Sequence, residues 1–153
     1  MRITWLLTWN PKYYDWDNPE DEEESIATLQ QTLSEGRRPQ MTWSCGPNKR
    51  IQKGDRLFII RLGIEPKGMV ASGYSLSNVY QMPHWDPDKA AAGEWKRYID
   101  LEFDKVLDAN SGQILPLRIL QFISTRIRWT PMSSGVEIPE EIVQDLESAW
   151  LCI

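Results

Sequence analysis

Alternating hydrophobic and polar residues predict several strands along this chain. Residues 2–9 have this two-residue period, with Ile3, Trp5 and Leu7 on one face. Residues 98–105 have it most clearly, and the alternation places Asp100, Glu102 and Asp104 on a solvent-exposed face. Further strands are predicted at residues 56–62 and 68–80, the second bent at Gly73, with shorter extended pieces at 40–44, 114–119 and 123–129.

Two other segments have the three-to-four-residue spacing of amphipathic helices. The first predicts a helix from about Glu20 to Glu35, which Gly36 ends, and the second predicts a last helix that begins at Pro139. Their apolar stripes are Ile26, Leu29 and Leu33, and Ile142, Leu146 and Trp150. Residues 81–94 are rich in Pro, Asp and Ala and predict a loop. Five to six strands with flanking helices predict an α+β fold, built on a curved mixed β-sheet or small barrel.

Length and composition indicate a single domain over residues 1–153, which we expect to be cut from a longer multidomain protein. Hydrophobic residues make up 41% and charged residues 25%, as in ordinary globular domains. No apolar run approaches the roughly 18 residues of a membrane span, and the stretch Ile3–Leu7 is too short for a signal-peptide core and lacks a small-residue cleavage site. Two distant cysteines fit a reducing compartment, so a cytoplasmic location is expected. One histidine and two cysteines are too few for a typical zinc site, and no metal or cofactor is expected.

The net charge of −5 conceals two oppositely charged segments. Residues 15–24 contain seven acidic side chains and no basic one, which suits the start of a helix. Residues 37–61 carry a local charge of +6. Such a basic segment favours binding to a phosphate backbone, although a solvated surface is the alternative.

Eight tryptophans are present, and most of them lie beside turn-forming residues. We assign Trp5, Trp129 and Trp150 to the core. Turn formers flank Trp9, Trp16, Trp43, Trp85 and Trp95, which predicts rings on loops or at strand ends. Rings in such places predict an aromatic pocket, for which Trp43, Trp9 and Trp85 are the strongest candidates.

Catalytic machinery is not evident in the sequence. His84 is the only histidine and is expected to be a structural hydrogen-bonding group. Cys45 is expected to be a small buried residue, since no second histidine is available to activate it. The carboxylates of the strand at 98–105 are expected to be solvated. The chain is therefore predicted to be a binding domain and not an enzyme.

An ordered set of motifs resembles the EVE domains of the PUA-like group, which also contains the YTH and SRA domains. The set covers nearly the whole chain: Trp5-Leu6-Leu7-Thr8-Trp9-Asn10-Pro11, Thr42-Trp43-Ser44-Cys45-Gly46, residues 51–61, residues 67–73, His84-Trp85-Asp86 and residues 98–103. The sequence is especially similar to EVE-like modules at the N-terminus of modification-dependent restriction endonucleases. The acidic, Tyr-rich loop from Tyr13 to Asp17 departs from the YTH pattern, so the identity of the base cannot be transferred.

The resemblance implies a reader in which a modified base is flipped into an aromatic pocket. It implies that Trp43-Ser44, Trp9-Asn10 and Trp85 contribute to this pocket, and that Ser133-Ser134 lies near the nucleic acid. Asn10 offers both a donor and an acceptor to a base edge, and Asp15 or Asp17 can accept from an exocyclic amine. Basic side chains expected to hold phosphates are Arg37, Arg38, Lys49, Arg50, Lys53, Arg126 and Arg128.

The leading hypothesis is recognition of double-stranded DNA that carries methylated or hydroxymethylated cytosine, which would target a fused or associated nuclease or GTPase effector. Two alternatives remain open at this stage. The pocket could read modified RNA, since open aromatic sites suit unpaired bases. It could also be an aromatic cage for methylated lysine, with attraction from the acidic loop. A small hydrolase is the weakest alternative, because no nucleophile and base can be assembled.

Overall fold

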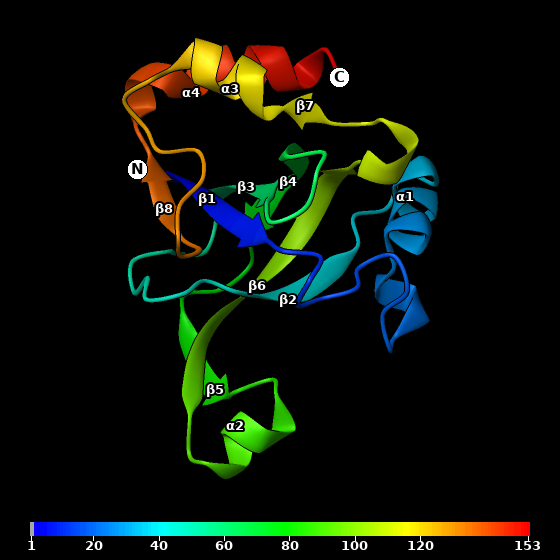
Figure 1. Ribbon diagram of the computed structural model, residues 1–153, viewed down its shortest axis with the longest axis vertical. Coiled ribbons are helices and arrows are strands. Elements are labelled where there is room, and N and C mark those ends of the chain that lie inside the picture. Colours follow the sequence, from blue (N-terminus) through cyan, green and yellow to red (C-terminus); the bar gives the residue numbers. More distant parts are fainter. Residues whose placement is uncertain (1) are drawn as a thin grey trace.

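The computed structural model describes residues 2–153, which form an α+β fold around one curved sheet (Figure 1). Within this range the sheet has eight strands, more than the five to six predicted. The strands are β1 (Thr4–Trp9), β2 (Gln40–Ser44), β3 (Arg56–Arg61), β4 (Gly68–Ser75), β5 (Tyr80–Pro83), β6 (Trp95–Val106), β7 (Leu115–Pro116) and β8 (Val136–Ile138). The helices are α1 (Ile26–Ser34), α2 (Pro87–Ala91), α3 (Leu117–Ile123) and α4 (Glu140–Leu151), with 3-10 turns η1 (Glu22–Glu24) and η2 (Ala109–Ser111).

The main path of the sheet runs β2-β6-β4-β3-β1-β8, and its pairs are antiparallel except that β1 is parallel to β3. The long strand β6 also pairs with β5, so the sheet extends past β2 into a projecting hairpin (Figure 1). The mixed, curved sheet expected from the sequence is confirmed.

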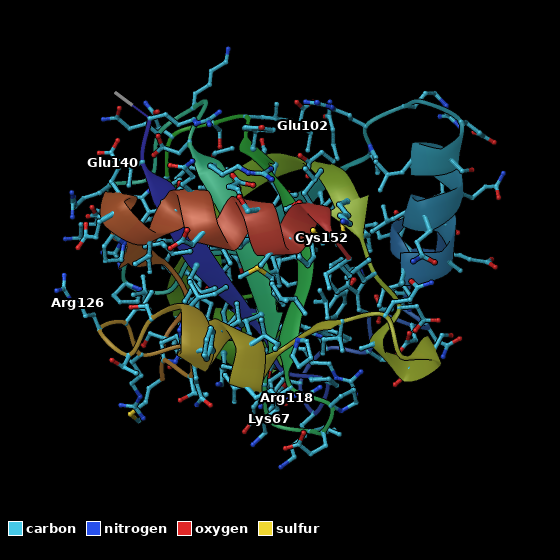
Figure 2. All side chains as sticks on the ribbon, turned by 90° about the horizontal axis from the view of Figure 1, so that it is seen from above. Lys67, Glu102, Arg118, Arg126, Glu140 and Cys152 are labelled. Carbon is cyan, nitrogen blue, oxygen red and sulfur yellow. The ribbon has the colours of Figure 1, made fainter. Side chains whose placement is uncertain are left out.

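Two hydrophobic layers cover the faces of this sheet. Trp5, Leu7 and Trp9 of β1 pack into a cluster that includes Ile26 and Leu29 of α1. The intervening Leu6 faces a second cluster built with Leu120 of α3 and with Leu146 and Trp150 of α4. Seen from above, α3 and α4 lie side by side across this second face, and α1 stands apart from them (Figure 2). Strands β1 and β3 are thus buried on both faces, which explains the nearly continuous apolar run of β3.

Two side-chain caps determine where the first helical segments begin. The predicted helix over residues 20–35 is divided, because Asp21 caps η1 and Ser25 caps α1, whose Thr28 N–H donates to Ser25 Oγ at 3.1 Å. Each cap satisfies an otherwise unpaired backbone donor, so two short helical segments replace one. Gly36 ends the helix with a φ of 81°, as predicted.

The bend predicted at Gly73 is confirmed as a register shift between β4 and β6. A side chain at Gly73 would collide with the carbonyl of Glu102, so glycine permits this close approach. The predicted strand over residues 68–80 ends at Ser75, and Tyr80 already belongs to β5.

Short apolar segments after residue 80 gave wrong predictions. The expected loop at 81–94 contains most of β5 and the helix α2. Of the strand expected at 114–119, only Leu115–Pro116 is extended, since α3 begins at Leu117. Residues 124–129 are a loop held by Trp129, whose indole N–H donates to the Ser124 carbonyl at 3.0 Å, and β8 was not anticipated. Short apolar runs do not distinguish helix from strand, because either can bury them.

Three tryptophans assigned to the core are buried as predicted. Trp5, Trp129 and Trp150 are each at most 2% exposed, and every indole N–H has a partner. No helix in residues 2–153 is both long and apolar enough to cross a bilayer. The same range contains no cluster of three or more His, Cys, Asp or Glu residues suited to a metal ion.

A buried arginine links the sheet to α4. Arg56 of β3 is 5% exposed and donates from Nε and Nη2 to Glu147 of α4 at 2.9 and 3.0 Å. Its Nη1 donates to Asp104 of β6 at 2.9 Å. Desolvation lowers the pKa of Arg56, but its hydrogen bonding to the Glu147 carboxylate and the charges of Asp104 and Glu147 raise this pKa, and the net shift is upward. Arg56 is therefore a structural cation, although the sequence placed it in the basic segment.

Candidate functional site

Three tryptophans meet at one end of the sheet and form a tryptophan cluster (Trp9, Trp16, Trp43). The Trp16 ring lies 5.2 Å from Trp9 at 87° and 4.8 Å from Trp43 at 53°. Exposures of 3%, 0% and 7% for Trp9, Trp16 and Trp43 leave almost no ring surface to solvent. Edge-to-face and tilted contacts of this kind are the preferred packing of aromatic rings.

Each indole N–H in the tryptophan cluster is satisfied by a backbone carbonyl. Trp9 donates to Tyr14 at 2.9 Å, Trp16 to Glu24 at 2.9 Å and Trp43 to Thr8 at 3.1 Å. The Trp9 bond folds the loop that follows β1 back onto its own strand, and the Trp16 bond ties the same loop to η1. Trp16 is therefore carried into the space between the other two rings.

The pocket expected from the sequence, with Trp9, Trp43 and Trp85 around one cavity, is not formed. Trp16 occupies the space between the first two rings, and Trp85 lies on the projecting β5–β6 hairpin, where its ring stacks on His84 at 5.3 Å. Burial of the Trp16 indole removes a large apolar surface from water, which favours this closed arrangement. A groove of about 510 Å³ lies elsewhere, against the start of α3, and none of the predicted site residues lines it.

Two loops form a rim beside the tryptophan cluster, and we call residues 45–50 and 131–135 the rim loops. Ser134 Oγ accepts from the Thr8 N–H at 3.1 Å, and Asn48 Nδ2 donates to the Gly135 carbonyl at 2.7 Å. A Cβ at Gly46 would stand 2.7 Å from the Ser134 carbonyl oxygen, so the loops approach within contact distance only because residue 46 is glycine. Trp9, Trp43, Ser44 and Ser134, predicted from distant segments, are thus brought to one end of the sheet.

The other predicted pocket residues lie near this end with their oxygens already engaged. Asn10 Oδ1 accepts from the Lys12 N–H at 2.9 Å, and exposed Asp15 accepts from the Asn18 N–H at 3.1 Å. Ser133 is exposed in the second rim loop. Each bond uses one oxygen of the side chain, so Asn10 Nδ2 and Asp15 Oδ2 can still meet a base edge, and the role of both residues stays a prediction.

The predicted phosphate-binding side chains divide into separate groups, all of them exposed. Lys49 and Arg50 lie on the first rim loop, and Arg126 and Arg128 on the segment that leads into the second (Figure 2 shows Arg126 pointing outward). Arg37 and Arg38 precede β2 at the end opposite Ser44, and Lys53 lies in the turn before β3. The basic segment 37–61 therefore does not present all its cations on one surface, since Arg56 and Arg61 are buried, and phosphate binding by the exposed ones stays a prediction.

Two residues beside the tryptophan cluster, Arg61 and Tyr14, were not among the predicted site residues. Arg61 is 5% exposed, and its guanidinium lies over the Trp9 ring, 5.4 Å from the ring centre. Its Nη1 donates to Asn110 Oδ1 at 3.2 Å, and its buried Nε has no hydrogen-bond partner in the described chain. Tyr14 packs edge-on against Trp43 at 6.1 Å, and burial together with Glu24, Asp21 and Asp15 raises its pKa to about 12. Only the parallel register of Trp9 with Arg61 could have indicated the first contact.

His84 has the structural role expected, since its Nδ1 accepts from the Asp86 N–H at 2.9 Å. Cys45, at the base of the first rim loop, is fully buried, as predicted. Burial raises the pKa of the Cys45 thiol to about 11, whereas Cys152 is exposed. At pH 8 only about one Cys45 in a thousand would be thiolate, the reactive form.

A thiol titration should therefore distinguish the two cysteines. We expect one thiol to react rapidly with Ellman's reagent in the native protein, and two after unfolding in urea. Cys152→Ser should remove the rapid phase, and a rapid phase that survives this substitution would contradict the burial of Cys45.

The curved sheet with α1 on one face and α3 and α4 on the other is the fold of solved structures that include human THYN1, and this agrees with the PUA-like fold that the resemblance implied. No family model matches the chain, and no curated protein does. Solved structures match it over nearly its full length. PSPTO5229 of Pseudomonas syringae has a TM-score of 0.62 at 17% identity, covering 95% of this chain and 97% of that one.

Two further structures share the fold. A hypothetical protein from Leishmania major has a TM-score of 0.59 at 15% identity, covering 99% of this chain and 96% of that one. Human THYN1, solved in complex with DNA containing 5-methylcytosine, has a TM-score of 0.56 at 15% identity and covers 95% of this chain and 96% of its own. At these identities the likeness establishes the fold.

Proposed function

We propose that this chain is a reader of double-stranded DNA carrying methylated or hydroxymethylated cytosine, and that the base is bound where the rim loops meet Trp43. One observation carries the proposal. Trp9, Trp43, Ser44 and Ser134 converge from three segments at one end of a PUA-like sheet, with Lys49, Arg50 and Arg128 nearby in the sequence. Human THYN1, which has this fold, was solved with methylated DNA, and this supports the same ligand class here.

The free energy gained by stacking a flipped base on a tryptophan is similar to the free energy lost when the base leaves the duplex. Removing a base from the stack costs a few kcal/mol, and stacking on an aromatic side chain returns about 1–3 kcal/mol. Because the tryptophan cluster is closed, entry of a base beside Trp43 requires the partly buried Tyr14, at the edge of Trp43, to move aside while Trp16 stays in the core.

Discrimination of the modification should be modest. A buried methyl group contributes on the order of 1 kcal/mol, which corresponds to about a fivefold preference. The nuclease or GTPase effector lies outside residues 1–153 in this proposal, either fused to the chain or associated with it. The chain alone should bind DNA without cleaving it.

Fluorescence anisotropy with matched oligonucleotides tests the proposal. Duplexes that differ only in one cytosine (unmodified, methylated or hydroxymethylated) are titrated at two salt concentrations, with the matched RNA as a competitor. We expect at least severalfold tighter binding of one modified duplex, and Lys49→Ala with Arg50→Ala should weaken all duplexes and reduce the salt dependence. Arg118→Ala is the matched control, because this exposed arginine lies on α3 and is not among the predicted phosphate-binding residues.

Equal affinity for all duplexes would overturn the reader function. Tighter binding of the RNA would move the proposal to modified RNA, and cleavage by the purified chain would contradict the separate effector. The methyl-lysine cage has no support from the structure, because Trp16 fills the space between the rings.

A further inference from the structure

The hairpin of residues 80–98 projects from the body of the protein, and we call it the arm. It consists of β5, α2 and the first residues of β6, and β2 reaches it only at the pair Ser44–Tyr98. Figure 1 shows the arm extending away from the sheet on the side opposite α3 and α4. Local hydrogen bonds hold its conformation, since Asp86 accepts from the Asp88 N–H at 3.0 Å and the His84 N–H donates to the Glu94 carbonyl at 2.9 Å.

Large apolar side chains are exposed on the arm. Trp85 is 58% exposed, Trp95 62% and Met82 46%. This contrasts with the six other tryptophans, which the fold buries to 7% exposure or less. The Trp85 ring is held by its stacking on His84, with a tilt of 34° between the planes, and over half of its surface is available to a partner.

Three basic side chains that form no salt bridge within the described chain also lie on the arm. Lys89, Lys96 and Arg97 have no carboxylate within 4.0 Å in the described chain, whereas Arg38, Arg50, Arg56 and Arg126 all have one. Lys89 and Lys96 lie close enough to His84 that, after desolvation, their charges lower its pKa. The arm's own acids are Asp86, which caps α2, Asp88 and Glu94. A flat ring beside unpaired ammonium groups matches the base and phosphate of a nucleotide.

The base of the arm adjoins the proposed site. Ser44 pairs with Tyr98, and the Cys45 N–H donates to the Arg97 carbonyl at 3.1 Å. The three residues from Tyr98 to Trp95 span about 10 Å at 3.4 Å per residue. That length equals about three nucleotides of one DNA strand.

We propose that the arm is a second nucleic-acid contact, in which Trp85 stacks on an unpaired or end base and Lys89 and Lys96 bind phosphates about three nucleotides from the site. This inference requires that the chain binds nucleic acid, as in the proposed function, but not that it prefers a modified base. The arm would add affinity that does not depend on the modification. It would also set a minimum length of flanking nucleic acid.

Trp85→Ala tests the stacking contact, and Phe122→Ala is the matched control because Phe122 is 90% exposed on α3. Binding is measured on unmodified single strand and on methylated and unmodified duplexes whose bases are unpaired from the third nucleotide beyond the target cytosine. Loss of one stacked base is worth about 1–3 kcal/mol, so Trp85→Ala should weaken all three at least fivefold. The preference for the modified duplex should stay unchanged, and Phe122→Ala should bind like the parent.

Two further measurements locate the contact. Lys89→Ala with Lys96→Ala should lower the salt slope by about 2 on duplex DNA. Shortening the flanks of the modified base from eight to two nucleotides should weaken the parent protein more than it weakens Trp85→Ala, in which only the phosphate contacts of Lys89 and Lys96 are left to lose. Circular dichroism checks that each variant is folded, which the exposure of these side chains leads us to expect.

Parent-like binding by Trp85→Ala would overturn the inference while leaving the reader function intact. The reverse result, weaker binding by Trp85→Ala in a protein without preference for modified cytosine, would overturn only the reader function. If Trp85→Ala converts a dimer to a monomer in sedimentation without changing affinity, the arm is a self-association surface, and the inference is also overturned.

Discussion

Trp16→Ala should lower the free energy of unfolding by about 3–5 kcal/mol, the range found when a buried Trp or Phe is truncated. The ring is fully buried against Trp9, Trp43 and Phe103, and its N–H holds the Glu24 carbonyl, so truncation leaves both a cavity and an unpaired acceptor. The midpoint of thermal unfolding should fall by roughly 6–20 °C for a domain of this size. Urea titration followed by circular dichroism measures the change.

Trp95→Ala is the control for this substitution, because the same residue type is 62% exposed on the arm and should change stability by no more than about 0.5 kcal/mol. Trp16→Phe should recover part of the loss, since a ring remains but the N–H does not. A loss below about 1 kcal/mol for Trp16→Ala would mean that the loop carrying Trp16 is not part of the core.

Arg56→Ala should destabilise the protein by about 3–5 kcal/mol, the usual cost of removing one partner from a buried ion pair. The substitution leaves Glu147 and Asp104 without their cation, and it removes a guanidinium that lies 4.8 Å from both the Phe58 and Tyr74 ring centres. Arg56→Lys should retain less than half of this stabilisation, because an ammonium cannot bind Glu147 through two parallel hydrogen bonds.

Arg37→Ala is the matched control, since this arginine is 67% exposed and its pair with Glu35 lies on the surface. Exposed pairs contribute about 0–1 kcal/mol. Equal effects of Arg56→Ala and Arg37→Ala would show that the contact between β3 and α4 does not depend on the ion pair. Both changes are measured as shifts in the urea midpoint at constant slope.

Local patterns in the sequence determined the main strands and helices of this fold. The strands β1 and β6, the apolar stripe of α4, the helix stop at Gly36 and the irregularity at Gly73 were predicted and are confirmed. These features follow from side-chain period and backbone freedom, which are properties of neighbouring residues. The solvated position expected for Asp104 on β6 is wrong, because Asp104 is half-buried and accepts from Arg56. The short elements after residue 80 were mistaken, because their apolar runs fit either secondary structure until a packing partner selects one.

Tertiary structure alone decided which tryptophans are buried together. Turn formers surround both Trp16 and Trp85, yet Trp16 is fully buried in the tryptophan cluster and Trp85 is exposed on the arm. The difference depends on the loop after β1, which folds back through backbone carbonyls that any residue carries and no sequence pattern reveals. In the same way, only the tertiary structure shows that Arg56 is buried in an ion pair while Lys49 and Lys89 are exposed to solvent. The sequence by itself determined the elements and the kinds of side chain available, while long-range packing determined which of them surround the proposed site.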